Sequence, residues 1–288
     1  MSPDNAGCAP ALDRAPTPPP VDPAFHWDRE GSRYLLRCQP LREVAQHALA
    51  VAQPPLPPGG PVEPPGPAAA ADSVAAAAAA LELPLARVMQ VRQVHGRSVR
   101  IVRSDRPATA DPGLRPDGDA VVADVPGLAL AVRVADCVPI LVADARGGVA
   151  AAVHAGWRGT CAGITAEAIA VIGREFGIPG TRLLAAIGPS IGPDDYEVGA
   201  EVRQAFLDAG HDPAHVARWF RPARRPGAWC LDLWAANRDQ LIGAGVARTA
   251  IHVAGVSTMA HPGWLESYRR DGPRAGRMAA VIVVPERA

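Results

Sequence analysis

The sequence of 288 residues lacks the features that mark membrane, secreted and nucleic-acid-binding proteins. It has no stretch of about 18 apolar residues free of charge and proline, which a membrane-spanning helix needs. Its first residues have no apolar core of the kind that a secretory signal carries. Basic and acidic residues number 29 each, so the net charge of zero gives no field that would attract nucleic acid. We therefore expect a cytoplasmic protein that binds neither membrane nor nucleic acid.

Cysteine is scarce as well, and no two cysteines are close together in the sequence. An odd number of dispersed thiols argues against a disulfide framework and for a reducing compartment. The chain also has neither a CxxC nor an HExxH motif, the usual short signatures of a metal site. The five cysteines are Cys8, Cys38, Cys137, Cys161 and Cys230.

Two segments are too rich in proline and too poor in large apolar side chains to form a core. Residues 1–24 are expected to be a disordered N-terminus, since they bury too little apolar area to offset the entropy of ordering. Residues 53–71 are expected to be a Pro/Ala-rich insertion within the domain. The rest of the chain, residues 25–288, is expected to be a single catalytic domain.

Short apolar runs outnumber amphipathic segments in this domain, and many follow each other through short turns. This pattern predicts an α+β (α/β) fold, a layered sandwich of mixed β-sheets with flanking helices. The segment 41–51 fits either a strand or a helix. Strands are expected at 34–38, 87–94, 119–124, 128–134, 138–143, 148–154, 183–188, 251–255 and 278–284, and helices at 74–83, 160–176, 200–209 and 233–242.

The most informative stretch is 128–159, in which two apolar runs flank Asp136 and Cys137 and a third ends at His154. Upstream, His95 lies at the end of another expected strand, and each histidine is soon followed by glycine. A buried charge such as Asp136 costs several kcal/mol unless it is paired, so its position beside an apolar run indicates a role. We expect Cys137, His154 and His95 to meet in space and to bind one metal ion.

The ligand set of one thiolate and two imidazoles suits Zn²⁺, and it leaves one tetrahedral position open for water or substrate. Copper at the same ligands is an alternative. A metal-free pair of Cys137 and His154, with the thiol as nucleophile, is the competing chemistry.

Arginines near this stretch are candidate anion binders, because the planar guanidinium fork matches phosphate or carboxylate. Arg158 follows His154 in a Gly-Trp-Arg-Gly turn, and Arg269 and Arg270 belong to the arginine-rich segment 267–277.

Six motifs between residues 87 and 284 together resemble a known family. They are QVHG (93–96), DAVVAD (119–124), ADCVPILVAD (135–144), VHAGWRGT (153–160), IGPSIGPDDYEVG (187–199) and SYRRDG…GR (267–277). In this order they resemble the YfiH-like proteins, a laccase-domain family described as polyphenol oxidases and as a peptidoglycan editing factor. Ser257 stands where the family has cysteine.

The resemblance implies one α/β domain and a metal, usually zinc, on the His of QVHG, the Cys of ADC and the His of HAGWRG. These are His95, Cys137 and His154. It also implies purine nucleoside phosphorolysis, in which adenosine, inosine, guanosine or methylthioadenosine reacts with phosphate, and adenosine deamination. The expected site residues are Cys137, His154 and Asp136 for catalysis and Arg158, Arg269, Arg270 and Gln93 for substrate binding.

Other functions compete with this interpretation. The first is a peptidoglycan-precursor amidase that would hydrolyse a muramyl–amino-acid bond without phosphate. A copper polyphenol oxidase ranks lower, because a multicopper site needs many more histidines than these three ligands supply. A metal-stabilised binding domain without turnover is the non-enzymatic alternative. We expect small-molecule partners only, and a monomer.

Overall fold

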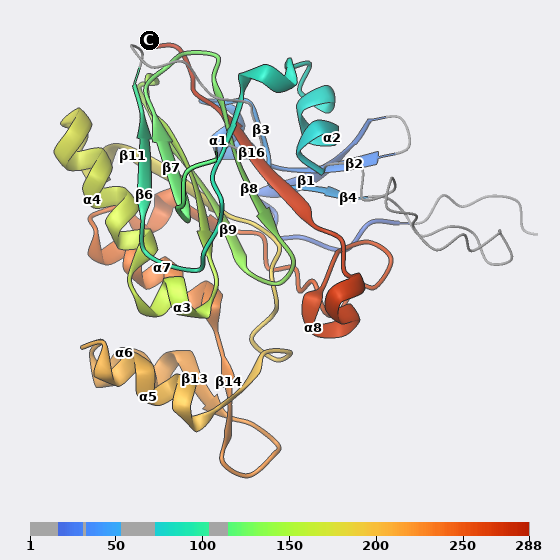
Figure 1. Ribbon diagram of the computed structural model, residues 1–288, viewed down its shortest axis with the longest axis vertical. Helices are drawn as coiled ribbons and strands as arrows, with labels where there is room; N and C mark the ends of the chain where they lie inside the picture. Colours follow the sequence, from blue (N-terminus) through green and yellow to red (C-terminus); the bar gives the residue numbers. More distant parts are fainter. Residues whose placement is uncertain (1–16, 31–32, 53–72, 104–114, 288) are drawn as a thin grey trace, which may run out of the picture.

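The computed structural model describes residues 17–30, 33–52, 73–103 and 115–287 and shows two stacked β-sheets between helices (Figure 1). The predicted layered sandwich of mixed sheets in a single domain is thereby confirmed. The larger sheet has six strands in the order β15-β11-β9-β10-β7-β6. Its strands are β6 (Val99–Val102), β7 (Ala120–Ala123), β9 (Val138–Asp144), β10 (Ala150–Ala155), β11 (Leu183–Ile187) and β15 (Ile251–Val253).

The second sheet has four strands in the order β3-β16-β8-β5. Each sheet is mixed: β5 runs parallel to β8, and β6 and β15 run parallel to their neighbours β7 and β11. The remaining pairs of both sheets are antiparallel. The strands are β3 (His47–Ala48), β5 (Val88–Gln90), β8 (Ala129–Val134) and β16 (Met278–Val283).

Alternation along the strands explains the layers, since successive side chains of a strand point to opposite faces. On β8, Leu130 and Val132 pack between the two sheets, whereas Ala129 and Ala131 face outward toward α2 (Ser73–Ala80). The outward residues are small, so the alanine-rich helix packs closely on this face. The outer face of the six-stranded sheet is covered by α3 (Trp157–Cys161), α4 (Ile164–Phe176) and α7 (Leu233–Gly243).

Two smaller units complete the described chain. An antiparallel sheet is formed by β1 (Phe25–Glu30), β2 (Arg33–Cys38) and β4 (Ala50–Ala52), with α1 (Gln39–Arg42) between β2 and β3. At the lower end in Figure 1 lie β12 (Glu197–Gly199), α5 (Ala200–Asp208), α6 (Pro213–Trp219), β13 (Phe220–Pro222) and β14 (Ala228–Leu231). The short helix α8 (Tyr268–Asp271) precedes β16.

The turn between β8 and β9 carries two residues of the expected site. The two strands follow each other in sequence but belong to different sheets. Asp136, with a positive φ of 84°, and Cys137 therefore lie where the chain crosses from one sheet to the other. This crossing places them at the end of the sandwich.

Several sequence-based boundaries need correction. The helix expected at 160–176 is broken, because Gly163 adopts a φ of 80° and separates α3 from α4. The strand expected at 87–94 ends at Gln90, and the segment 41–51 supplies parts of α1 and β4 together with β3. Other boundaries agree with the sequence to within a few residues. The strands β1, β6, β12, β13 and β14 and the helices α6 and α8 were not expected.

The two predicted proline-rich segments fall largely outside the described residues. Residues 1–16 and 53–71 are not described, so the expectations for them remain predictions. In the described residues 17–24, the Pro19 carbonyl accepts from Trp27 Nε1, and the Asp22 N–H donates to the Ala254 carbonyl. These hydrogen bonds fix the segment to the domain. No helix in the described parts is long and apolar enough to cross a membrane.

Candidate metal centre

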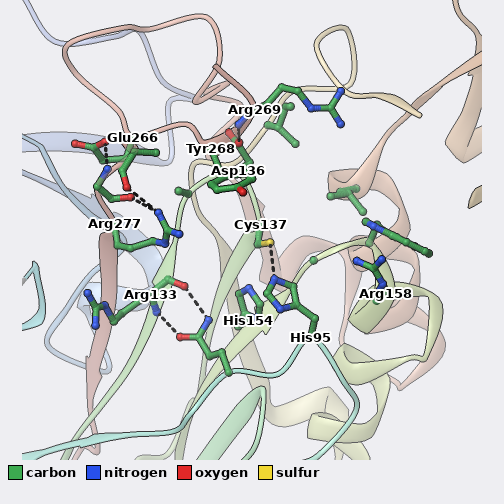
Figure 2. A pocket seen from close by; sticks show the side chains of 18 of the residues that line it. His95, Arg133, Asp136, Cys137, His154, Arg158, Glu266, Tyr268, Arg269 and Arg277 are labelled. Carbon is green, nitrogen blue, oxygen red and sulfur yellow. Dashed lines mark hydrogen bonds between the residues drawn. The ribbon is translucent and has the colours of Figure 1, made fainter. Parts of the chain in front are cut away.

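A cavity of about 1000 Å³ opens at the end of the sandwich where the β8–β9 turn lies. Cys137, His95 and His154 lie at its centre, and charged side chains surround them (Figure 2). Six arginines line the wall, against the two carboxylates of Asp136 and Glu266. The arginines are Arg92, Arg115, Arg133, Arg158, Arg269 and Arg277.

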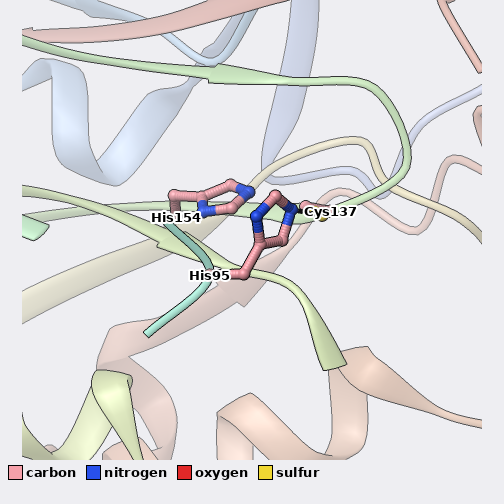
Figure 3. A group of neighbouring side chains, drawn as sticks. All are labelled: His95, Cys137 and His154. Atoms are coloured by element: carbon pink, nitrogen blue, oxygen red, sulfur yellow. Dashed lines mark hydrogen bonds between the residues drawn. The ribbon is translucent and has the colours of Figure 1, made fainter. Parts of the chain in front are cut away.

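The three expected ligands are brought together from three separate segments (Figure 3). Their ligand atoms all lie within 4.8 Å of one another. Cys137 Sγ is 3.9 Å from His95 Nε2, and the two imidazole rings lie edge to face with centroids 4.8 Å apart. His95 is exposed, Cys137 is partly buried and His154 is buried, so the cluster is accessible from one side.

Asp119 holds both histidines in place and is completely buried. Its carboxylate accepts hydrogen bonds from the backbone N–H groups of His95 (2.9 Å) and Gly96 (2.6 Å). Its Oδ1 also lies 2.9 Å from Nδ1 of His154. Nε2 of His154 is therefore the nitrogen left for a ligand, and the carboxylate fixes the ring orientation as such partners do in metal sites.

Contacts among Cys137, His154 and Asp119 shift the pKa values of all three side chains. Burial by itself raises the pKa of the Cys137 thiol, but its interactions with His154 and His95 outweigh burial and lower the pKa to about 6. Burial lowers the pKa of His154, whereas Asp119 and Cys137 together raise it to about 9. Burial likewise opposes ionisation of Asp119, and the hydrogen bonds from His154 and the backbone keep its pKa below the ordinary value. The cluster thus favours a thiolate, which is the form that binds metal.

The Gly156 position leaves room for the ligands. A Cβ at this position would lie 2.9 Å from Cys137 Sγ and 3.2 Å from Cδ2 of His95. The glycine of the HAGWRG motif is required here because the backbone passes directly behind two ligands.

The residues present fit a tetrahedral metal ion. Bonds of about 2.0–2.3 Å require ligand atoms roughly 3.5 Å apart, so the three side chains need to close by only about 1 Å. One sulfur and two nitrogens are donors that zinc prefers, and three protein ligands leave a fourth position open to the cavity.

Asp136 is placed in the cavity wall, but its carboxylate already has two partners. It accepts from Thr258 Oγ1 and from the Arg269 N–H, both at 2.6 Å. These contacts fix the loop that carries Arg269, and the catalytic role expected for Asp136 stays a prediction. Gln93 has a similar position: its side-chain amide exchanges two hydrogen bonds of 2.8 Å with the backbone of Arg133. This pairing positions the His95 turn.

The three arginines that were predicted to bind substrate differ in position. Arg158 and Arg269 line the cavity, where their guanidinium groups lie over the rings of Trp157 and Tyr196. Arg270 does not line it. Its guanidinium donates to the carbonyls of Thr258 and Leu265 and pairs with Asp271, so it stabilises the loop instead of facing a substrate.

The family model described as multi-copper polyphenol oxidoreductase laccase matches residues 66–285. The chain belongs to this laccase-domain family. A relative named purine nucleoside phosphorylase from Deinococcus radiodurans is 39% identical over 73% of this chain and 75% of its own length.

A further relative carries the same name, and a solved structure has the same fold as this chain. A protein of Bacteroides thetaiotaomicron, also named purine nucleoside phosphorylase, is 39% identical, and the match spans 58% of this chain and 60% of that protein. The crystal structure of YlmD from Geobacillus stearothermophilus superposes with a TM-score of 0.75 and 31% identity, covering 90% of this chain and 99% of that one. The expected YfiH-like family and fold are therefore confirmed.

Sequence reasoning missed several residues of this laccase-domain site. Asp119 was recognised only as the start of an apolar strand, although a carboxylate before four buried residues was a usable signal. Arg133 and Arg277 were not identified as cavity residues, because their common position depends on the pairing of β8 with β16.

Proposed function

We propose that this protein is a purine nucleoside phosphorylase. It converts adenosine, inosine, guanosine or methylthioadenosine and phosphate to the free base and the sugar 1-phosphate. The observation that carries the proposal is the His95–Cys137–His154 cluster at the centre of a large cavity with an excess of arginine. The names of the laccase-domain relatives support it.

His95, Cys137 and His154 would hold a zinc ion in this proposal. When bound, zinc supplies Lewis-acid stabilisation of negative charge and an activated water, which is the chemistry that adenosine deamination as a second activity requires. We favour zinc over copper because the described residues contain one three-ligand cluster, whereas a multicopper oxidase needs several metal positions.

The chain's own residues bind and orient the reactants. The positive charge of the cavity wall attracts phosphate, and guanidinium groups match its oxygens in bidentate fashion. Arg158 and Arg269, each over an aromatic ring, offer flat surfaces on which a purine can stack. Asp136 and Gln93 act by fixing the loops that carry Arg269 and His95.

The proposal includes the setting expected from the sequence, a cytoplasmic monomer acting on small molecules. The peptidoglycan-precursor amidase is the alternative, and none of the described cavity residues favours it over phosphorolysis.

The proposal is tested by incubating metal-analysed protein with adenosine, with and without phosphate, and measuring adenine, ribose 1-phosphate and inosine. We expect adenine only with phosphate and inosine under both conditions. Cys137→Ala should abolish all products, whereas Cys230→Ala, a cysteine of β14 outside the cavity, should keep them. Wild-type protein that forms no product from adenosine in either condition contradicts the proposal.

A further inference from the structure

The four-stranded sheet brings two arginines to one part of the cavity. In the pairing of β8 with β16, Arg133 lies opposite Ala279, and Arg277 precedes Ala279 by two residues. Residues two apart on a strand share a face, so Arg133 and Arg277 occupy diagonal positions on the same side of neighbouring chain segments. Figure 2 shows both on the side of Cys137 away from Arg158.

This arrangement is unfavourable without a counter-charge. Two like charges at diagonal cross-strand positions repel each other, and Arg277 is the more exposed of the two. Nε of Arg133 is buried and has no hydrogen-bond partner within the described residues. A buried donor without a partner is unfavourable, and an oxyanion would supply that partner.

The surrounding residues hold the pair and keep the wall positive. Nη1 of Arg277 donates to the carbonyls of Ala275 and Gly276, at 2.9 and 2.8 Å. The Gly276 N–H in turn donates to Glu266 Oε2 at 2.8 Å. Glu266 contributes one negative charge to this part of the wall, against the two positive charges of Arg133 and Arg277. The net charge therefore still favours an anion.

The backbone of Arg133 is also fixed, by its two hydrogen bonds with Gln93, two residues before His95. The arginine pair and the metal cluster are thus linked through a single residue and share one cavity. A tetrahedral oxyanion at the pair and a reactant at the cluster would occupy the same cavity.

We propose that Arg133 and Arg277 form the binding site for inorganic phosphate, and that the nucleoside base occupies the opposite side, near Arg158 and Trp157. This assignment rests on the proposed phosphorylase function. Arg133→Gln and Arg277→Gln remove one guanidinium each and keep a polar side chain of similar length.

The first test measures the KM for phosphate at saturating adenosine. Each substitution should raise it by about tenfold or more, the loss expected for charge-assisted hydrogen bonds, and leave the KM for adenosine nearly unchanged. Arg277→Lys, which keeps the charge but loses the fork, should fall in between. Arg174→Gln on α4, outside the cavity, should match wild type. A raised KM for adenosine with an unchanged KM for phosphate overturns the assignment.

The second test needs no turnover. Phosphate added at constant ionic strength should raise the Tm of wild type and of Arg174→Gln, because a ligand of the native state stabilises it. The rise should be lost in Arg133→Gln and Arg277→Gln. If these shifts appear but wild type performs no phosphorolysis, the anion site stands and the phosphorylase function fails. If phosphate shifts the Tm of all four proteins equally, the site assignment fails.

Discussion

Two buried histidines in this molecule behave in opposite ways. His154, in the metal cluster, is 3% exposed and has a pKa raised to about 9, while His47, on β3, is 0% exposed and has a pKa lowered to about 4. Burial lowers the pKa of both. The difference comes from the partners: His154 faces the carboxylate of Asp119 and the thiol of Cys137, whereas His47 faces backbone groups.

The hydrogen-bond partners distinguish His47, a structural histidine, from His154, which can bind a ligand. Nδ1 of His47 lies 2.9 Å from the Ala45 carbonyl and Nε2 accepts the Cys38 N–H at 3.0 Å, so both nitrogens are satisfied within the fold. His154 has one nitrogen held by Asp119 and the other left toward the cavity. A buried histidine with one unused nitrogen beside a thiol is a ligand position, and burial alone does not reveal it.

The largest expected effect comes from removing the partner that distinguishes His154. Asp119→Asn keeps the shape of the side chain but loses the charge that accepts from His154 and from two backbone groups. We expect zinc affinity to fall by about 10- to 100-fold, the range found for such supporting carboxylates. A competition titration with a chromogenic chelator measures it. Asp117→Asn, at an exposed carboxylate paired with Arg92, is the control.

Gly156→Ala tests whether the ligands need the space behind them. The added methyl would lie 2.9 Å from Cys137 Sγ, so either the thiol or the backbone has to move. We expect zinc affinity to fall by about tenfold, in line with a ligand displaced from its position. In Gly173→Ala the nearest atom to the new Cβ is 3.7 Å away, so affinity should not change. Equal affinities in the two variants would mean that the cluster adapts freely.

Arg270→Gln tests the claim that this arginine stabilises a loop and binds no substrate. Several hydrogen bonds to carbonyl groups are lost, and we expect the free energy of unfolding to fall by about 2–3 kcal/mol with the KM for adenosine unchanged. Chemical denaturation and steady-state kinetics measure the two effects. Arg274→Gln, at an exposed residue, serves as the control. A raised KM for adenosine with an unchanged free energy of unfolding would mean that Arg270 binds substrate.

The last prediction concerns His47 and the pH dependence of stability. Its pKa is about 4 in the folded chain against the ordinary 6.5 of a histidine, so the unfolded chain binds more protons between these values. The contribution of His47 to the free energy of unfolding is therefore fully present above about pH 6.5 and is lost as the pH falls toward 4. We expect a loss of about 2 kcal/mol between pH 7 and pH 5. His47→Gln should flatten this part of the pH profile in denaturation experiments; an unchanged slope would contradict the neutral assignment.

The sequence allowed the centre of the site to be predicted better than its walls. Cys137 directly precedes β9 and His154 lies near the end of β10, and strand ends are marked by apolar runs that stop at a turn. The crossing of the chain from one sheet to the other at Asp136 was not visible, because β8 and β9 have the same apolar pattern whether they pair or not. Gly163 broke an expected helix because its left-handed backbone interrupts an otherwise continuous amphipathic pattern.

The arginines show why the residues of the cavity walls were harder to predict from the sequence than the metal ligands. Arg269 and Arg270 are adjacent in sequence, yet one lines the cavity and the other binds loop carbonyls, since the turn of α8 directs them apart. Arg133 and Arg277 meet only through the pairing of distant strands. Such positions follow from tertiary structure and leave no local signal.

The central claim is that His95, Cys137 and His154 form one metal site, and metal content per chain tests it most directly. Mass spectrometry of the native protein after zinc loading should find one zinc ion per chain in wild type and in Cys230→Ala. It should find none in Cys137→Ala. Wild type that retains no zinc, or a Cys137→Ala variant that retains as much as wild type, would contradict the account.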